Sequence, residues 1–116
     1  MSEIRTVDQL PPGDATPSQV KALLDLGHDL VLLDVREPAE VAICRIEGAL
    51  EIPLGVLPLR FSEVPMDRDV VVFCKMGGRS AQAVWFLNSK GYTRVRNLSG
   101  GIIRWADEVD PGMRKY

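Results

Sequence analysis

Apolar residues along this chain fall into short blocks, and the spacing within each block predicts a strand or a helix. Residues 30–33 and 70–73 are unbroken apolar runs that end at Asp34 and Cys74. Runs of this length are typical of strands buried on both faces, as in the middle of a parallel sheet. A shorter candidate strand within 51–54 is closed by a proline, and a last one near residue 95 alternates as a half-exposed strand does.

Helical spacing occurs between these strands. Residues 16–19 read Thr-Pro-Ser-Gln, a capping box with proline at the first helical position, and apolar residues at helical spacing follow. A second helix is predicted over 79–90, and we interpret Trp85 in it and Trp105 further on as core aromatics. One helical turn is expected within 55–66, and a short helix around Trp105.

The alternation of strands and helices predicts an α/β domain with a mostly parallel central sheet flanked by helices. We expect the domain to span residues 16–107. Residues 1–15 contain a Pro-Pro-Gly break and are expected to be an N-terminal arm or a peripheral strand. Residues 108–116 are expected to be a polar C-terminal tail.

Polar residues follow both strong strands. Asp34 and Arg36 end the first, and Cys74 and Lys75 end the second. Because ligands bind at the carboxyl ends of the strands in such sheets, this edge is the predicted site.

The amino-acid composition limits which classes of protein this chain can belong to. The 116 residues are 46% hydrophobic and 26% charged, which is ordinary for one globular domain. A net charge of −2 does not favour a dedicated nucleic-acid binder. The sequence has no apolar stretch of membrane-spanning length and no signal-peptide pattern at its start, so we expect a cytoplasmic location with reduced thiols.

The chain contains two cysteines, Cys44 and Cys74, and one histidine, His28. A Cys/His zinc site needs about four such ligands, so we expect no metal site of that kind. We expect no organic cofactor either.

Cys74 opens the segment that carries the chemistry. It ends a predicted strand and is followed by Lys75, Met76, Gly77, Gly78, Arg79 and Ser80, which lead into a helix. Successive backbone N–H groups in such a loop bind an anion, and the helix dipole adds partial positive charge at the same place. A sulfur at the centre is therefore stabilised as a thiolate nucleophile.

The chain is similar to a rhodanese-like sulfurtransferase domain across roughly residues 16–107. The matching segments are Leu33-Asp34-Val35-Arg36-Glu37, Gly48-Ala49 with Ile52-Pro53, the loop from Cys74 to Arg79, and Leu98-Ser99-Gly100-Gly101 with Trp105. Residues 40–49 and 110–112 resemble a subgroup. That subgroup is the rhodanese domain fused to adenylyltransferases that charge sulfur-carrier proteins, of the molybdopterin-synthase sulfurylase type.

The resemblance implies a mechanism. Cys74 would take a sulfane sulfur from a small anionic donor such as thiosulfate, or from a protein persulfide, and hold it as a persulfide inside the loop. A thiophilic acceptor would then remove the sulfur. A cysteine desulfurase and a sulfur-carrier protein are possible partners.

Two other functions stay open at this point. Rhodanese folds also serve as protein-interaction modules, although such modules usually lack the cysteine. Related phosphatases and arsenate reductases have an arginine after five intervening residues, whereas here Arg79 follows Cys74 after four and Ser80 takes that place. The loop length therefore favours sulfur transfer.

The sequence suggests roles for several supporting residues. Asp34 is the candidate ion-pair partner of Arg79, and Arg36 and Lys75 lie where an anionic donor would approach. Cys44 and the next residue replace a Gly-His pair common in the family. Cys44 is either a resolving thiol or, as we favour, a structural one.

Overall fold

The computed structural model describes residues 4–116, and within that range five strands form one parallel sheet. The strand order is β1-β5-β4-β2-β3. The strands are β1 Asp14–Ala15, β2 Leu30–Asp34, β3 Leu50–Glu51, β4 Asp69–Phe73 and β5 Val95–Leu98. The register aligns Asp34 of β2 with Phe73 of β4, so both strands end at the same level. This alignment brings the two polar strand ends together.

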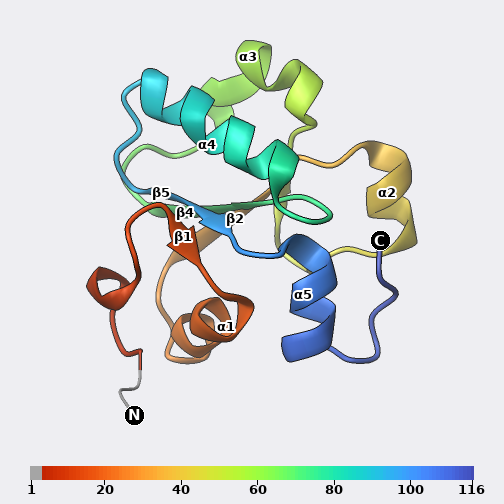
Figure 1. Ribbon diagram of the computed structural model, residues 1–116. Helices are drawn as coiled ribbons and strands as arrows, with labels where there is room; N and C mark the ends of the chain where they lie inside the picture. The colour runs from red at the N-terminus through yellow and green to blue at the C-terminus, as the bar shows by residue number, and fades with distance from the viewer. Residues whose placement is uncertain (1–3) are drawn as a thin grey trace.

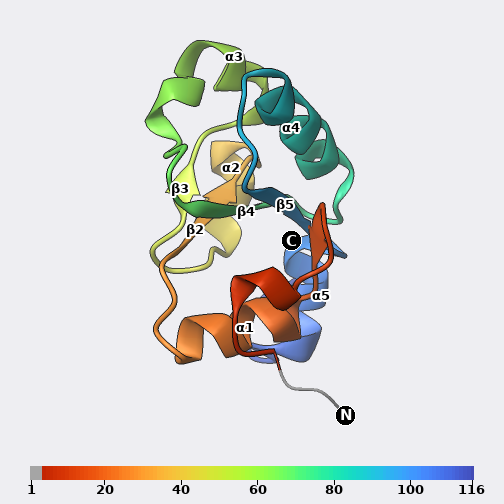
Figure 2. The same cartoon turned by 90° about the vertical axis from the view of Figure 1, so that its left-hand side faces the viewer.

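Helices cover both faces of the sheet (Figures 1 and 2). α3 and α4 lie on one face and α1 and α5 on the other, while α2 follows the carboxyl end of β2. The helices are α1 Pro17–Asp25, α2 Pro38–Ile43, α3 Leu57–Arg60, α4 Gly78–Ser89 and α5 Gly101–Glu108. Short 3₁₀ turns occupy Val7–Gln9, Leu54–Val56 and Phe61–Glu63.

The central strands contribute to two hydrophobic cores. Val72 of β4 points to the core beneath α4, where it joins Leu87, and Phe73 points to the core beneath α1, where it joins Leu23. All four residues are fully buried, and each such side chain stabilises the fold by about 1.5–3 kcal/mol. Because both faces of β4 are covered, its sequence has no polar alternation. The predicted α/β architecture is confirmed.

Some predicted boundaries differ from the structure. The third strand is shorter than 51–54, because Pro53 has no N–H with which to continue the ladder, although the Ile52 N–H still donates to Asp34 O at 3.0 Å. Residues 54–63 form three consecutive short helical segments, where we expected a single turn.

The prediction for Trp85 is wrong. Trp105 is 5% exposed and lies in the core, whereas Trp85 is 74% exposed. α4 buries the face that carries Ala83, Val84 and Leu87. Trp85 follows Val84, and a rotation of about 100° per residue turns its side chain toward solvent.

β1 and Tyr116 also contribute to the sheet and to the surroundings of Arg36. Asp14 and Ala15 pair with Asn97 and Leu98 of β5, so β1 forms one edge of the sheet. At the other end, the backbone carbonyl of Tyr116 accepts a hydrogen bond from Arg36 Nη1 at 3.1 Å. Within residues 4–116, none of the helices is long and apolar enough to span a bilayer.

Candidate active site

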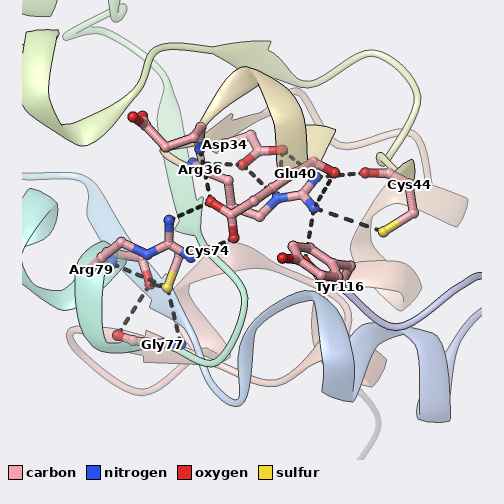
Figure 3. A network of polar contacts seen from close by, with 10 residues as sticks. Asp34, Arg36, Glu40, Cys44, Cys74, Gly77, Arg79 and Tyr116 are labelled. Atoms are coloured by element: carbon pink, nitrogen blue, oxygen red, sulfur yellow. Dashed lines mark hydrogen bonds and ion pairs between the residues drawn. The ribbon is translucent and has the colours of Figure 1, made fainter. Parts of the chain in front are cut away.

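The carboxyl ends of β2 and β4, together with the first turns of α2 and α4, frame one polar cluster (Figure 3). Cys74 lies at its centre and is 2% exposed. The predicted loop from Lys75 to Ser80 divides into two parts. Its last three residues, Gly78 to Ser80, form the first turn of α4, so only Lys75 to Gly77 are true loop.

The Cys74 sulfur accepts hydrogen bonds from the start of α4. The Gly77 N–H lies 3.1 Å from Sγ and the Ser80 N–H lies 3.4 Å from it, while the Ser80 hydroxyl is 3.3 Å away. Gly77 has φ +119°, a conformation that residues with a Cβ rarely adopt, and this turns its N–H toward the sulfur. The geometry is that of an anion-binding helix terminus.

These contacts change the acidity of the thiol. Burial is the largest single influence and opposes ionisation, but hydrogen bonds from the Ser80 hydroxyl and from the N–H groups of Ser80, Gly77 and Met76 outweigh it. The net result is that the pKa of the Cys74 thiol is lowered from its ordinary value. A lowered pKa increases the fraction of thiolate, the nucleophilic form, at neutral pH.

The N-terminus of α5 donates backbone hydrogen bonds to the start of the Cys74 loop. The Ile102 N–H donates to Cys74 O at 2.9 Å and the Ile103 N–H donates to Lys75 O at 3.2 Å. These bonds fix both carbonyls on the α5 side. A Cβ on Gly101 would lie 2.3 Å from Lys75 O, so the close approach requires glycine at this position.

Arg79 forms its ion pair with a residue that the sequence analysis did not single out. Its Nη1 and Nη2 lie 2.6 and 2.8 Å from the two carboxylate oxygens of Glu40 on α2. The hydrogen bond from Arg79 is the main reason why the pKa of Glu40 falls to about 2. The expected pairing of Arg79 with Asp34 is wrong, because Asp34 is already engaged by Arg36.

Asp34 and Arg36 form a buried pair beneath α2. Arg36 Nη2 donates to Asp34 Oδ2 at 2.7 Å, and both side chains are fully buried. Nη2 also donates to the backbone oxygen of Cys44, and Nη1 donates to the backbone oxygens of Glu40 and Tyr116. In this arrangement Arg36 supports the start and end of α2, and it does not face an incoming anion.

Ser80 has a second partner that sequence reasoning missed. Its hydroxyl lies 2.6 Å from Asn97 Oδ1 on β5, and Asn97 Nδ2 donates to Gly77 O at 3.2 Å. Asn97 therefore holds both residues that contact the sulfur through their N–H groups. The signal for Asn97 was weak, because a polar residue on a half-exposed strand is common.

Three residues lie around the entrance to the loop. Met76 is 69% exposed, and Lys75 Nζ lies 4.4 Å from the ring centroid of Tyr116. Lys75 thus keeps its charge near the site in a position that an anion can reach. Tyr116 could not have been identified from the sequence, because only the fold brings it there.

Cys44, the second thiol, caps the end of α2 and is partly buried. Its sulfur lies 3.7 Å from Arg36 Nη1. Both cysteines are free, and residues 4–116 contain no cluster of three or more His, Cys, Asp or Glu side chains arranged to hold a metal ion.

The family profile described as "Rhodanese-like domain" matches residues 16–108. A protein named sulfurtransferase from Allochromatium vinosum is 53% identical over 79 residues, which are 68% of this chain and 74% of that protein. A probable adenylyltransferase/sulfurtransferase, MoeZ, from Mycobacterium tuberculosis is 38% identical over 87% of this chain. This chain spans only 26% of MoeZ.

Solved structures agree with these sequence matches. The human single-domain sulfurtransferase TSTD1 superimposes with a TM-score of 0.73 at 30% identity, covering 84% of this chain and 98% of that one. A rhodanese-related protein from Thermoplasma volcanium gives a TM-score of 0.75 at 29% identity, over 83% and 92% of the two chains. The predicted resemblance, including the adenylyltransferase-fused subgroup, is confirmed.

Proposed function

Because the chain belongs to the rhodanese-like family, in which its named relatives are sulfurtransferases, we propose that it transfers sulfane sulfur through a persulfide on Cys74. The observation that carries this proposal is the position of the Cys74 sulfur at the N-terminus of α4. There the sulfur accepts hydrogen bonds from the backbone N–H groups of Gly77 and Ser80.

With thiosulfate as the donor, the Cys74 thiolate attacks the outer sulfur. A new S–S bond forms on Cys74, and the donor S–S bond breaks with its electron pair leaving on sulfite. The enzyme then carries a persulfide anion, Cys74–S–S⁻. Cyanide attacks the outer sulfur of that persulfide, which gives thiocyanate and restores the thiolate, so neither half-reaction needs an external oxidant or reductant.

The hydrogen-bond donors around Cys74 stabilise both the thiolate and the persulfide anion. Charge-assisted hydrogen bonds from fixed N–H groups stabilise a sulfur anion more than they stabilise a neutral thiol. Lys75 lies near the entrance, where it attracts an anionic donor. Two free thiols also fit a reducing compartment such as the cytoplasm.

Proteins are the physiological reactants in this proposal. We propose that a protein persulfide, as on a cysteine desulfurase, supplies the sulfur and that a sulfur-carrier protein or a thiol receives it. The likeness to a family member fused to an adenylyltransferase supports a protein partner.

Intact-protein mass spectrometry tests the proposal. After incubation with thiosulfate, the wild-type protein should gain one sulfur atom that cyanide removes, and Cys74→Ser should gain none. Cys44→Ser is the matched control, and it should gain the sulfur as the wild type does. A folded wild-type protein that gains no sulfur from thiosulfate or from a low-molecular-weight persulfide contradicts the proposal and favours a protein-interaction module.

A further inference from the structure

Arg79, which is paired with Glu40, is the one charged residue of α4, and none of the fully exposed positions of this helix is charged. Its exposed residues are Gly78, Ala81, Gln82, Trp85, Asn88 and Ser89. Charged residues make up 26% of the chain, so a whole uncharged helix face is unusual here. Trp85, at 74% exposure, is the largest side chain on it.

A groove of about 590 Å³ runs between α4 and the segment that contains α3. Its walls include Leu54, Pro58, Ala81, Gln82, Trp85 and Phe86. Next to Pro58, Leu59 is 85% exposed. Exposed apolar patches of this kind mark interaction sites, and tryptophan is prominent among the residues that dominate binding energy at interfaces.

The groove is within reach of the reactive sulfur. α3 and α4 lie side by side on one face of the sheet, and the Cys74 loop precedes α4 directly (Figures 1 and 2). Trp85 comes seven residues after Gly78, so it lies about 10 Å along the helix axis from the terminus that holds the sulfur. A partner anchored at Trp85 can therefore place a flexible segment at Cys74.

The charges without an ion-pair partner at the two ends of α4 are basic. Lys75 lies just before α4 and Lys90 just after it, and neither has an ion-pair partner within the described part of the chain. Lys90 Nζ lies 5.5 Å from the ring centroid of Phe86, which lines the groove. The helices α3 and α4 contain no Asp or Glu, although the chain as a whole has a net charge of −2. The local charge is complementary to an acidic partner.

We propose that this groove docks the protein that exchanges sulfur with Cys74. The docking partner places an apolar side chain beside Trp85 and carboxylates opposite Lys75 and Lys90. This inference rests on the proposed function. In the exchange, the Cys74 thiolate attacks the outer sulfur of the partner's persulfide. The partner's S–S bond breaks, its thiolate leaves with the electron pair, and Cys74 becomes the persulfide, so atoms and electrons balance.

Three matched peptides that carry a cysteine persulfide serve as probes. The first has leucine flanked by glutamates, the second has leucine flanked by lysines, and the third has alanine flanked by glutamates. In each, a six-residue Gly-Ser segment joins the persulfide to the docking sequence. Such a segment spans about 13 Å on average, which is enough to reach from Trp85 to Cys74. The rate of sulfur addition to Cys74 is measured by intact mass at low ionic strength.

The glutamate-leucine peptide should load wild-type Cys74 at least tenfold faster than the other two. Trp85→Ala should remove most of that advantage, and Trp85→Phe should keep part of it. Loading by thiosulfate should stay within twofold of wild type in both variants, because Trp85 does not contact the sulfur. Leu26→Ala is the matched control, since Leu26 is 60% exposed at the end of α1 on the other face, and it should change none of these rates.

Fluorescence provides a second measurement that does not depend on chemistry. Trp85 is exposed and Trp105 is buried, so docking of the glutamate-leucine peptide without its persulfide should shift the wild-type emission to shorter wavelength. The docking site is overturned if the three peptides load Cys74 at equal rates, or if the glutamate-leucine peptide keeps its advantage in Trp85→Ala. The proposed function still stands in that case, provided that thiosulfate loads Cys74. Failure of thiosulfate and of every peptide to load Cys74 overturns the proposed function itself.

Discussion

Both terminal nitrogens of the Arg79 guanidinium, Nη1 and Nη2, face the Glu40 carboxylate, at 2.6 and 2.8 Å. Arg79 belongs to the first turn of α4 and Glu40 to the first turn of α2. The pair therefore joins α4, whose N-terminus contacts the Cys74 sulfur, to α2, the helix that follows β2. Glu40 Oε1 also accepts the Glu37 N–H at 3.0 Å. The bidentate geometry fixes the angle of the α4 terminus as well as its position.

This pair should make stability depend on pH. The pKa of Glu40 is about 2 in the folded protein against 4.5 as its ordinary value. Since the folded pKa is depressed, the contribution of Glu40 is complete above pH 4.5 and is lost as the pH falls toward 2. We expect Glu40→Gln to cost about 1–2 kcal/mol at pH 7, allowing for solvent screening of the partly exposed Arg79.

Urea unfolding at pH 7, 4 and 2.5 checks this expectation. The difference in the free energy of unfolding between wild type and Glu40→Gln should shrink each time the pH is lowered. Glu63→Gln is the control, because Glu63 pairs with Arg60 on the exposed surface, where ion pairs contribute little to stability. A difference that stays constant with pH contradicts the role assigned to Glu40.

Ser80→Ala should raise the pKa of the Cys74 thiol. The serine hydroxyl can turn from Asn97 Oδ1 toward Sγ and donate to the thiolate, and alanine removes that donor. A hydrogen bond to a charged group contributes about 1.5–3 kcal/mol, so its loss favours the protonated thiol and moves the titration to higher pH. The pH profile of Cys74 alkylation by iodoacetamide measures the shift. Ser89→Ala, at the far end of the same helix, should leave the profile in place.

Gly101→Ala should disrupt the Cys74 loop. The new methyl group would lie 2.3 Å from Lys75 O, and Gly101 has φ +64°. Gly48→Ala separates the two effects, because Gly48 has φ +82° but no atom within 4 Å of the added carbon. We expect Gly48→Ala to cost about 1–2 kcal/mol from backbone strain alone and Gly101→Ala to cost more. Thermal unfolding and thiosulfate loading of both variants compare them, and equal effects would mean that the close approach is unimportant.

Arg36→Met should destabilise the fold strongly. It would leave the Asp34 carboxylate buried without a counter-charge, which typically costs about 3–5 kcal/mol. The double variant Asp34→Asn with Arg36→Met should recover part of that loss, since it buries no charge. Urea unfolding of the single and double variants measures both values. If Arg36→Met loses less than about 1 kcal/mol, the buried pair does not support the site as described.

The main predictions from sequence came from strong local signals. β4, Asp69–Phe73, contains the predicted run 70–73, because a short unbroken apolar run is stable as a strand that is covered on both faces. Cys74 meets the start of α4 for an equally local reason, since only four residues, Cys74 to Gly77, separate the strand from the helix. The family resemblance rested on these same local segments.

Long-range choices were harder to predict. Asp34 and Glu40 are both carboxylates near the strand ends, and the sequence does not say which one Arg79 binds. Arg36 is two residues from Asp34 and binds its carboxylate in the folded protein, while Arg79 binds Glu40. Trp85 was predicted to be buried because an apolar side chain at helical spacing indicates a covered position. The spacing does not say whether the chain's own core or a partner covers it.

The sequence by itself determined the order of strands and helices, the parallel sheet, and the reactive loop with Cys74 at its start. The order of the elements and the reactive loop depend on residues close in the chain, so periodicity and glycine positions express them directly. The parallel pairing was inferred from the alternation of strands with helices, because a helix between two strands lets the second strand run in the same direction as the first. The tertiary structure alone decided that Asn97 and Glu40 brace the loop, that α5 holds its carbonyls, and that Trp85 faces solvent beside a groove. Each of these depends on how helices far apart in sequence pack on the sheet, and many arrangements satisfy the same local pattern.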